Sequence, residues 1–318
     1  MELDRETIEK LIRQAFPQAT VISSRLLESK SLNSNYALQL QNPSAEIVLR
    51  IYRPGIAQHT VEKEMHVLRV VMPETGVPTF RVIHFDTTQT IINSSYAVLN
   101  LLPGEPLENA LPRMGELDLE ATGYEMGRYL AKLHTIPLQK YGEFMGRDPL
   151  TSNNEKTYTL ARLMEWLELC EQHRLLDSSI ITELQSLASQ TLVLDRSPAC
   201  FVHGNYHQRN IKVQEGVAGF HVTGVFNFED AQGWSPEWDM TNLFGCVFDD
   251  YPAMIQGFLD GYVDTGELPE KFWDRLRIYR HVRNVYRVLC AHRAGNETLL
   301  KTKQEQLHHF VKNKQEGY

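Results

Sequence analysis

The sequence contains few cysteines, and they are far apart. Its 318 residues include only four, Cys170, Cys200, Cys246 and Cys290. They lie in apolar runs such as "PACFVHG" and "NLFGCVF", and their spacing matches neither a zinc site nor a disulfide framework. We therefore expect a protein of a reduced compartment, by default the cytoplasm.

The sequence also lacks any cluster of positive charge. Lys and Arg number 32 against 40 Asp and Glu, which gives a net charge of -8 at pH 7. A protein of this charge is poorly suited to nucleic acid or to an anionic membrane. We therefore expect neither to be the main partner.

Long apolar segments are missing as well. The N-terminus "MELDRETIEKLIRQAF" has no signal-peptide core, and no segment reaches 18 apolar residues in a row. The sequence thus predicts a soluble protein that is not exported. With 42% hydrophobic residues, the chain is long enough for two lobes, each with a core of its own.

The hydrophobic pattern changes along the chain from strands to helices. It predicts a helix over 4–16, and period-two alternation in "NYALQLQN" and "AEIVLRIY" then predicts an antiparallel sheet. Helical spacing in "TVEKEMHVLRVVM" places Glu64 at the edge of a buried stripe, where a carboxylate needs a partner. After the Pro- and Gly-containing stretch 96–107 the pattern is mainly helical. We therefore expect an α+β protein with lobes at 1–102 and 103–318.

Polar residues collect where predicted strands of the second lobe end. His203, Asn205 and Asn210 follow "CFVHG", and Asn227 and Glu229 follow "FHVTGVFNF". Side chains in such loops can face a ligand. An Asn-rich turn alone is more often structural, because Asn tolerates left-handed backbone and caps its neighbours. The spacing of the whole set favours a site.

This order of motifs resembles the aminoglycoside phosphotransferase and choline kinase family, small-molecule relatives of protein kinases. The family's catalytic loop is His-Gly-Asp, four residues and Asn, and residues 203–210 read "HGNYHQRN". By that resemblance Asn205 occupies the catalytic-base position, His203 belongs to the same motif, and Asn210 is the metal-binding amide.

Two further motifs of the second lobe fit the same family. "NFE" resembles its Asp-aromatic-Glu motif, so Asn227 stands where the main magnesium carboxylate belongs and Glu229 completes the motif. In "SPEWDM", Asp239 is similar to the aspartate that braces the catalytic loop.

The resemblance extends to the first lobe. Arg50 in "VLRIYRPG" stands where the family has a phosphate-contacting Lys, with Glu64 as its ion-pair partner. The loop "SKSLNSNYAL", which includes Ser34, would cover the nucleotide phosphates although it has no Gly. The backbone near Asn100 and Leu102 would form the hinge that binds the nucleotide base. The alternative for Arg50 and Glu64 is a simple surface ion pair, and the alternative for the hinge is an ordinary linker between the lobes. The resemblance implies a bilobal protein-kinase-like fold with ATP or GTP and Mg²⁺ as cofactors.

The two asparagines set an expectation about activity. Asn keeps one acceptor oxygen but is neutral and cannot accept the proton, so Asn205 and Asn227 predict impaired transfer and weakened metal binding. The chain is either altered at these positions to trap an inactive complex or a natural pseudokinase that binds a nucleotide, a metabolite or a protein. A third interpretation treats "HGNYHQRN" as a structural turn.

The acceptor is expected to be a small molecule with a hydroxyl group. The resemblance places an acidic segment at the acceptor pocket, with Asp249, Asp250, Asp260 and Asp264. These carboxylates would suit an amine-bearing substrate such as an aminoglycoside or choline. An aminoglycoside substrate would imply a role in antibiotic resistance. The alternative is that these residues are solvated helix ends. His134 and His207 are expected to be structural.

Overall fold

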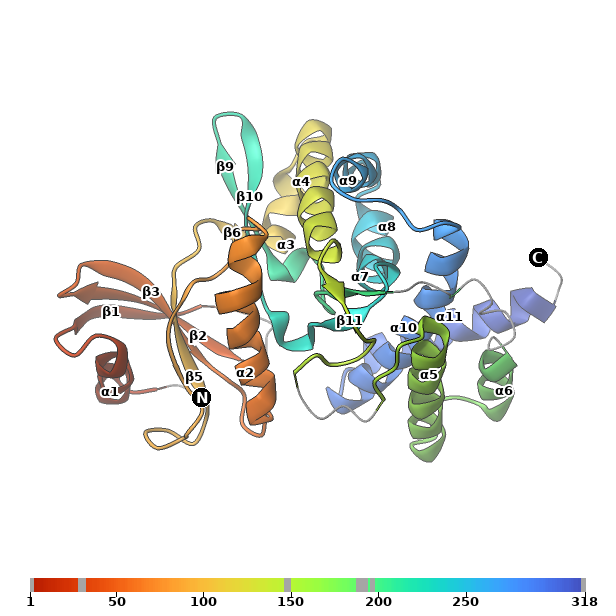
Figure 1. Ribbon diagram of the computed structural model, residues 1–318, viewed down its shortest axis with the longest axis horizontal. Coiled ribbons are helices and arrows are strands. Elements are labelled where there is room, and N and C mark those ends of the chain that lie inside the picture. Colours follow the sequence, from red (N-terminus) through yellow and green to blue (C-terminus); the bar gives the residue numbers. More distant parts are fainter. Residues whose placement is uncertain (1–2, 28–32, 146–149, 187–193, 195–197, 316–318) are drawn as a thin grey trace.

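A five-stranded antiparallel sheet dominates the N-terminal part of the chain (Figure 1), with strand order β1-β2-β3-β5-β4. The structure is a computed structural model that describes residues 3–27, 33–145, 150–186, 194 and 198–315. The elements of this part are α1 (Arg5–Ala15), β1 (Thr20–Leu27), β2 (Ser34–Gln41), β3 (Ala45–Ile51), α2 (Gln58–His66), β4 (Val82–Asp86) and β5 (Tyr96–Asn100).

Local sequence signals explain the first of these elements. The Asp4 side chain accepts a hydrogen bond from the Thr7 backbone N–H at 2.7 Å and so caps α1. In β2 the buried residues are Tyr36, Leu38 and Leu40, which alternate with more exposed ones. The helix predicted over 4–16 and the alternating strands are thus confirmed.

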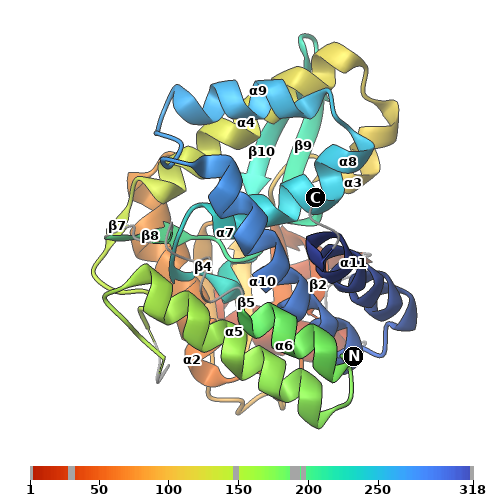
Figure 2. The same cartoon turned by 90° about the vertical axis from the view of Figure 1, so that its right-hand side faces the viewer.

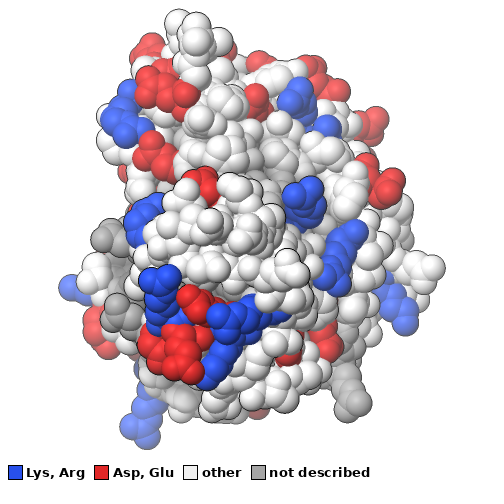
Figure 3. Space-filling view, turned by 90° about the vertical axis from the view of Figure 1, so that its left-hand side faces the viewer, with Lys and Arg blue, Asp and Glu red and all other residues white. Residues whose placement is uncertain are grey.

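Charges of both signs are interspersed on the side of the molecule that carries this sheet (Figure 3). Along α1 they form pairs one helical turn apart, Arg5 and Arg13 with Glu9 and Lys10 with Glu6. Such exposed pairs contribute little to stability but keep the surface mixed in sign.

The rest of the chain is mainly helical, which confirms the α+β fold class. Its helices are α3 (Leu107–Ala110), α4 (Glu116–His134), α5 (Glu155–Gln172), α6 (Ser178–Ser186), α7 (Glu237–Asn242), α8 (Phe248–Asp250), α9 (Met254–Val263), α10 (Phe272–Arg293) and α11 (Glu297–Gln315). Its strands are β6 (Glu105–Pro106), β7 (Pro137–Leu138), β8 (Ala199–Val202), β9 (Ile211–Gly216), β10 (Gly219–Val225) and β11 (Gln232–Trp234). Within the described ranges, no helix combines the length and apolarity needed to cross a membrane.

The helix α2 is shorter than its sequence pattern predicts. It ends at His66, and the residues 67–71 form a wider π-helical turn that leads into Pro73. Pro73 has no N–H to donate to the Arg69 carbonyl, so the regular ladder cannot continue past this turn. Glu64, expected at the edge of the buried face, is fully buried.

Helices α4 and α9 approach each other through glycine. A Cβ at Gly127 would lie 2.0 Å from the Phe258 carbonyl oxygen, and one at Gly261 would lie 2.0 Å from that of Tyr124. No side chain fits at these two positions, so the glycines allow the two backbones to touch. This contact holds α9 against the helix that ends at His134.

Gly127→Ala is therefore expected to destabilise the protein by about 1–3 kcal/mol, because the added methyl group must push α9 away. The matched control is Gly245→Ala, since a Cβ at Gly245 meets nothing within 4 Å. Urea unfolding of both variants checks the prediction, and equal midpoints would show that the α4–α9 contact yields without cost.

Candidate functional site

Asp239 holds the loop that follows β8. Its carboxylate accepts hydrogen bonds from the backbone N–H groups of His203 at 2.7 Å and Gly204 at 2.8 Å, and it contacts the His134 ring at 3.2 Å. Burial by itself raises the pKa of Asp239, but the His134 hydrogen bond and nearby positive groups outweigh it and lower the pKa. Asp239 is thus ionised and holds the backbone of this loop, while the catalytic role of the loop stays a prediction.

Gly204 lets the loop turn sharply. Its φ is +80°, and a Cβ there would lie 2.1 Å from the Asp230 carbonyl oxygen, so only glycine fits. The loop is thereby pressed against the segment that carries Asn227 and Glu229.

His203 binds backbone on both sides of its ring. Its Nε2 lies 3.0 Å from the Phe226 carbonyl oxygen, and its Nδ1 accepts from the Asn205 backbone N–H at 3.2 Å. Burial lowers the pKa of His203, which keeps the ring neutral and fits one donating and one accepting nitrogen. This geometry positions the loop and leaves no ring nitrogen for a proton from substrate.

Three asparagines at the predicted base and metal positions form one chain of amides. Asn210 donates from its side chain to the Asn205 backbone oxygen at 2.8 Å, and Asn227 donates to the Asn210 side-chain oxygen at 3.4 Å. Asn227 has φ +72°, a left-handed conformation that Asn tolerates better than most residues. The structure therefore brings Asn205, Asn210 and Asn227 together, and none of them supplies a carboxylate.

Glu229 faces the N-terminal part of the chain instead of this amide chain. Arg53 binds its Oε2 at 2.8 Å, and the Asn33 amide donates to its Oε1. Asn33 also accepts from the Arg53 backbone N–H at 3.0 Å, which ties the three residues together. Burial raises the pKa of Glu229, and the nearby Glu64 adds to that effect. Arg53 and Asn33 were not predicted as site residues, although Arg53 lies only three residues after Arg50.

Arg50 and Glu64 form the ion pair that the sequence predicted, and it is buried. Their closest nitrogen and oxygen are 2.8 Å apart, and the side chains are 4% and 0% exposed, so the surface-pair alternative is wrong. Burial opposes the charge of Arg50, but Glu64 outweighs it and raises the pKa of Arg50. Glu64 also accepts from Tyr52 and from the Phe228 backbone N–H. The carboxylate thus joins β3 and α2 to the segment that carries Glu229.

The predicted nucleotide-binding backbone lies around β2 and the end of β5. Ser34 begins β2 and pairs with Ile51, whereas residues 29–32 of the predicted phosphate loop lie outside the described residues. Asn100 ends β5, and its side chain accepts from the Arg81 backbone at 2.5 Å. The Leu102 carbonyl accepts from Lys212 at 2.9 Å, so Lys212 holds one carbonyl of the predicted hinge.

The residues at the predicted metal positions do not fit a magnesium ion. Mg²⁺ prefers carboxylate oxygens, but Asn210 and Asn227 are neutral amides and the Glu229 carboxylate is bound to Arg53 and Asn33. Among the residues that the structure describes, no group of three or more His, Cys, Asp or Glu is placed to hold a metal. The donor set therefore supports no reaction step through a magnesium ion.

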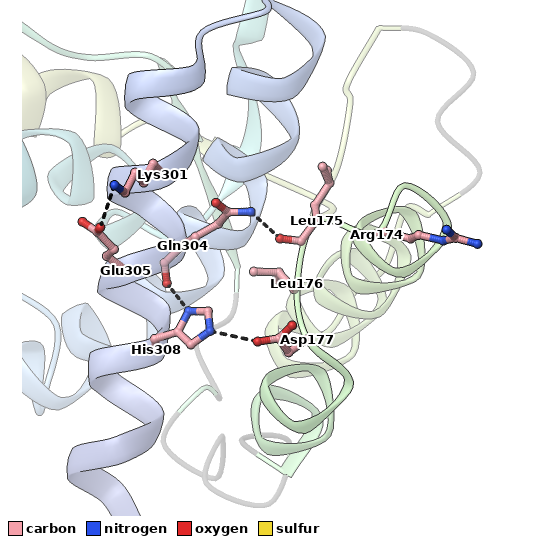
Figure 4. A pocket seen from close by; sticks show the side chains of 8 residues that line it. All are labelled: Arg174, Leu175, Leu176, Asp177, Lys301, Gln304, Glu305 and His308. Atoms are coloured by element: carbon pink, nitrogen blue, oxygen red, sulfur yellow. Dashed lines mark hydrogen bonds and ion pairs between the residues drawn. The ribbon is translucent and has the colours of Figure 1, made fainter.

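Two hollows lie apart from the catalytic loop. One, of about 280 Å³, lies between α11 and the α5–α6 connection (Figure 4), where His308 contacts the Gln304 carbonyl and Asp177, and Gln304 binds the Leu175 carbonyl. These polar side chains bind one another, which is typical of helix packing.

The second hollow bears on the predicted acceptor pocket. It has about 450 Å³ and is lined by α4, α9 and Phe220, with Asp260 at its edge. Asp264 on the same side accepts from the Tyr124 hydroxyl at 2.5 Å. Asp260 and Asp264 thus lie along the groove between α4 and α9, while Asp249 and Asp250 are exposed on α8.

Solved structures share this architecture over nearly the whole chain. A thermostable mutant of aminoglycoside phosphotransferase APH(4)-Ia, in ternary complex with ADP and hygromycin B, superposes with a TM-score of 0.71 at 16% identity, covering 96% of this chain and 98% of that one. The GDP complex of wild-type aminoglycoside 2'-phosphotransferase-IIIa gives 0.70 at 15% identity, covering 98% and 100%. The GDP and kanamycin complex of APH(2")-IIia gives 0.67 at 14% identity, covering 98% and 99%.

Sequence comparison identifies the family. A comparison with curated protein sequences gave no significant match. The family described as "Phosphotransferase enzyme family" matches residues 23–279, which is most of the chain and includes the catalytic loop, the "NFE" motif and the "SPEWDM" segment. The chain therefore belongs to the phosphotransferase enzyme family.

Proposed function

We propose that the chain binds a purine nucleotide, ATP or GTP, between its sheet and its helical part, and that as written it transfers the γ-phosphoryl group to a small-molecule hydroxyl only poorly. The chain of amides formed by Asn205, Asn210 and Asn227 carries this proposal. It links the positions that the family's motifs assign to the catalytic base and the metal, but it offers no carboxylate to accept the hydroxyl proton.

The rest of the machinery supports binding. Asp239 still braces the loop, and the buried pair of Arg50 and Glu64 still joins the sheet to the segment after β10. These contacts hold the loop and join the two parts of the chain without taking part in proton transfer. Nucleotide affinity and catalysis are therefore separable in this chain.

A second candidate, a nucleotide-binding module that works without metal, is favoured by the pair of Arg53 and Glu229. The Arg53 side chain is 40% exposed while it binds Glu229 at 2.8 Å. A guanidinium provides fixed positive charge and planar donors for phosphate, which is the electrostatic part of what magnesium supplies. We propose that Arg53 faces the nucleotide phosphates and makes binding independent of Mg²⁺.

Arg53→Gln is expected to weaken ADP or ATP binding about 10-fold in EDTA, because one charge-assisted hydrogen bond is lost. Isothermal titration calorimetry, with and without Mg²⁺, measures this effect. Arg69→Gln, which removes an exposed Arg of the same lobe, is the control and should leave the affinity unchanged. Binding that requires Mg²⁺ would contradict the metal-free mode, and no nucleotide binding under either condition would contradict the proposed function.

A further inference from the structure

Three cationic side chains lie near one another on the two C-terminal helices, and one of them reaches the loop that follows β8. Arg283 and Arg287 belong to α10, and Lys303 belongs to α11, which packs against α10 (Figure 2). Arg283 and Lys303 are each 4% exposed, and Arg287 is half-buried. This cationic cluster is in contact with the loop, because Arg283 donates to the Gly204 carbonyl oxygen at 3.1 Å.

Among the residues with described positions, the hydrogen-bond partners of the cationic cluster are all neutral. Arg283 also donates to the Trp238 carbonyl at 2.7 Å and to the Thr241 hydroxyl at 3.1 Å, and its guanidinium lies over the Trp238 ring. Arg287 donates to the Asn242 side-chain oxygen at 2.8 Å and to the Cys246 sulfur at 3.3 Å.

Lys303 donates to the Gln306 side-chain oxygen at 2.8 Å. Within the described part of the chain, no carboxylate oxygen lies within the 4.0 Å of an ion pair from any nitrogen of the cluster. The side chains are therefore held in place, and none of them forms a direct ion pair with a carboxylate of the described residues.

The positive groups are close enough to oppose one another. Burial lowers the pKa of Arg283 to about 10, and Arg287 adds to this effect. Burial also lowers the pKa of Lys303, and the positive charges of Arg287 and Arg280 add to this effect. Burial lowers the pKa of His207 to about 3. The acids that face these groups are Asp239, which is held by the loop, and the exposed Asp230 and Asp249.

We propose that the cationic cluster of Arg283, Arg287 and Lys303 binds an anionic group, a carboxylate or a phosphate, of the small molecule that lies beside Asn205. Keeping these positive groups out of water is unfavourable when no carboxylate pairs with them directly and only Asp239, Asp230 and Asp249 lie nearby, and a bound anion reduces that cost. The half-buried Arg287 presents a planar set of donors suited to such a group. This inference rests on the proposed function, and it makes the ligand acidic rather than the amine that Asp249 and Asp250 suggested.

The test compares three molecules that differ in one group: glycerol, glycerate and glycerol 3-phosphate. Calorimetric titration in the presence of saturating ADP is expected to show binding of at least one of the two anions and at least 10-fold weaker binding of glycerol. Arg287→Gln and, separately, Lys303→Met should weaken anion binding at least 10-fold. The control is Arg277→Gln on the same helix, which is 71% exposed and should change nothing.

The same titrations separate failure of this inference from failure of the proposed function. If ADP binds but glycerol binds as well as the anions, or if Arg287→Gln leaves anion affinity unchanged, the inference is wrong and the proposed function stands. Anions that compete with ADP would also overturn it, because they would occupy the phosphate site. Titrations repeated without ADP decide the question even if ADP itself fails to bind, and the melting temperature of each variant confirms that it is folded.

Discussion

Asn205→Asp combined with Asn227→Asp is expected to raise the rate of phosphoryl transfer by about 10²- to 10⁴-fold over the chain as written. A carboxylate at position 205 would accept the proton of the attacking hydroxyl, which the neutral Asn205 amide cannot do. A carboxylate at position 227 would add negative charge beside Asn210, whose side-chain oxygen lies 3.4 Å from the Asn227 amide, and so complete the family's metal position. Each single variant should recover less than the pair, because both functions are needed for one reaction.

The measurement is nucleotide consumption with a panel of hydroxyl acceptors that includes acidic, neutral and amine-bearing molecules. A matched control is Asn93→Asp with Asn296→Asp, which adds the same two charges at exposed positions and should stay inactive. If the restored pair turns over, the acceptor that supports it identifies the substrate class. If the double variant binds nucleotide and shows no gain in phosphoryl transfer, the binding-module interpretation is favoured. The two asparagines are then not what prevents catalysis.

Arg275→Met is expected to destabilise the protein by about 3–5 kcal/mol, because it leaves two buried carboxylates without this cation. Arg275 on α10 binds Glu155 of α5 and Glu237 of α7, each at 2.5 Å, and both acids are fully buried. Burial by itself lowers the pKa of Arg275, but the two carboxylates outweigh it and raise the pKa. Since α7 also carries Asp239, loss of this network should loosen the brace of the catalytic loop.

Chemical unfolding with urea measures the loss. Arg277→Met on the same helix removes an exposed pair with Asp274 and should change stability by less than about 1 kcal/mol. Adding Glu155→Gln and Glu237→Gln to Arg275→Met should recover much of the loss, because the two buried negative charges are then gone. A triple variant as unstable as Arg275→Met alone would show that packing, rather than charge, accounts for the effect.

Much of the architecture could be predicted from local pattern. The capped helix at 4–16, the alternating strands and the helical second part all follow from periodicity and turn residues, which act over a few neighbours. The early end of α2 was not predicted, because a widened turn has nearly the same apolar spacing as a regular helix.

The candidate site, like the architecture, could be predicted from the sequence in part. The order of His203, Asn205, Asn210, Asn227 and Asp239 along the chain is enough to indicate the loop and its brace. By itself the sequence determined the family, the α+β architecture and the absence of carboxylates at 205 and 227, because each is written in residue identity and spacing.

Tertiary structure alone decided where the remaining charges lie. Arg53 meets Glu229 across 176 positions of the chain, and Arg283 meets the Gly204 carbonyl across 79. Electrostatic interactions depend on distance in space and on burial, and neither is encoded in local sequence pattern. Only the fold shows that Glu229 is paired with a guanidinium rather than open to a metal. Only the fold shows, too, that Arg283 reaches the loop and that neither it nor its neighbours Arg287 and Lys303 form an ion pair with a carboxylate of the described residues.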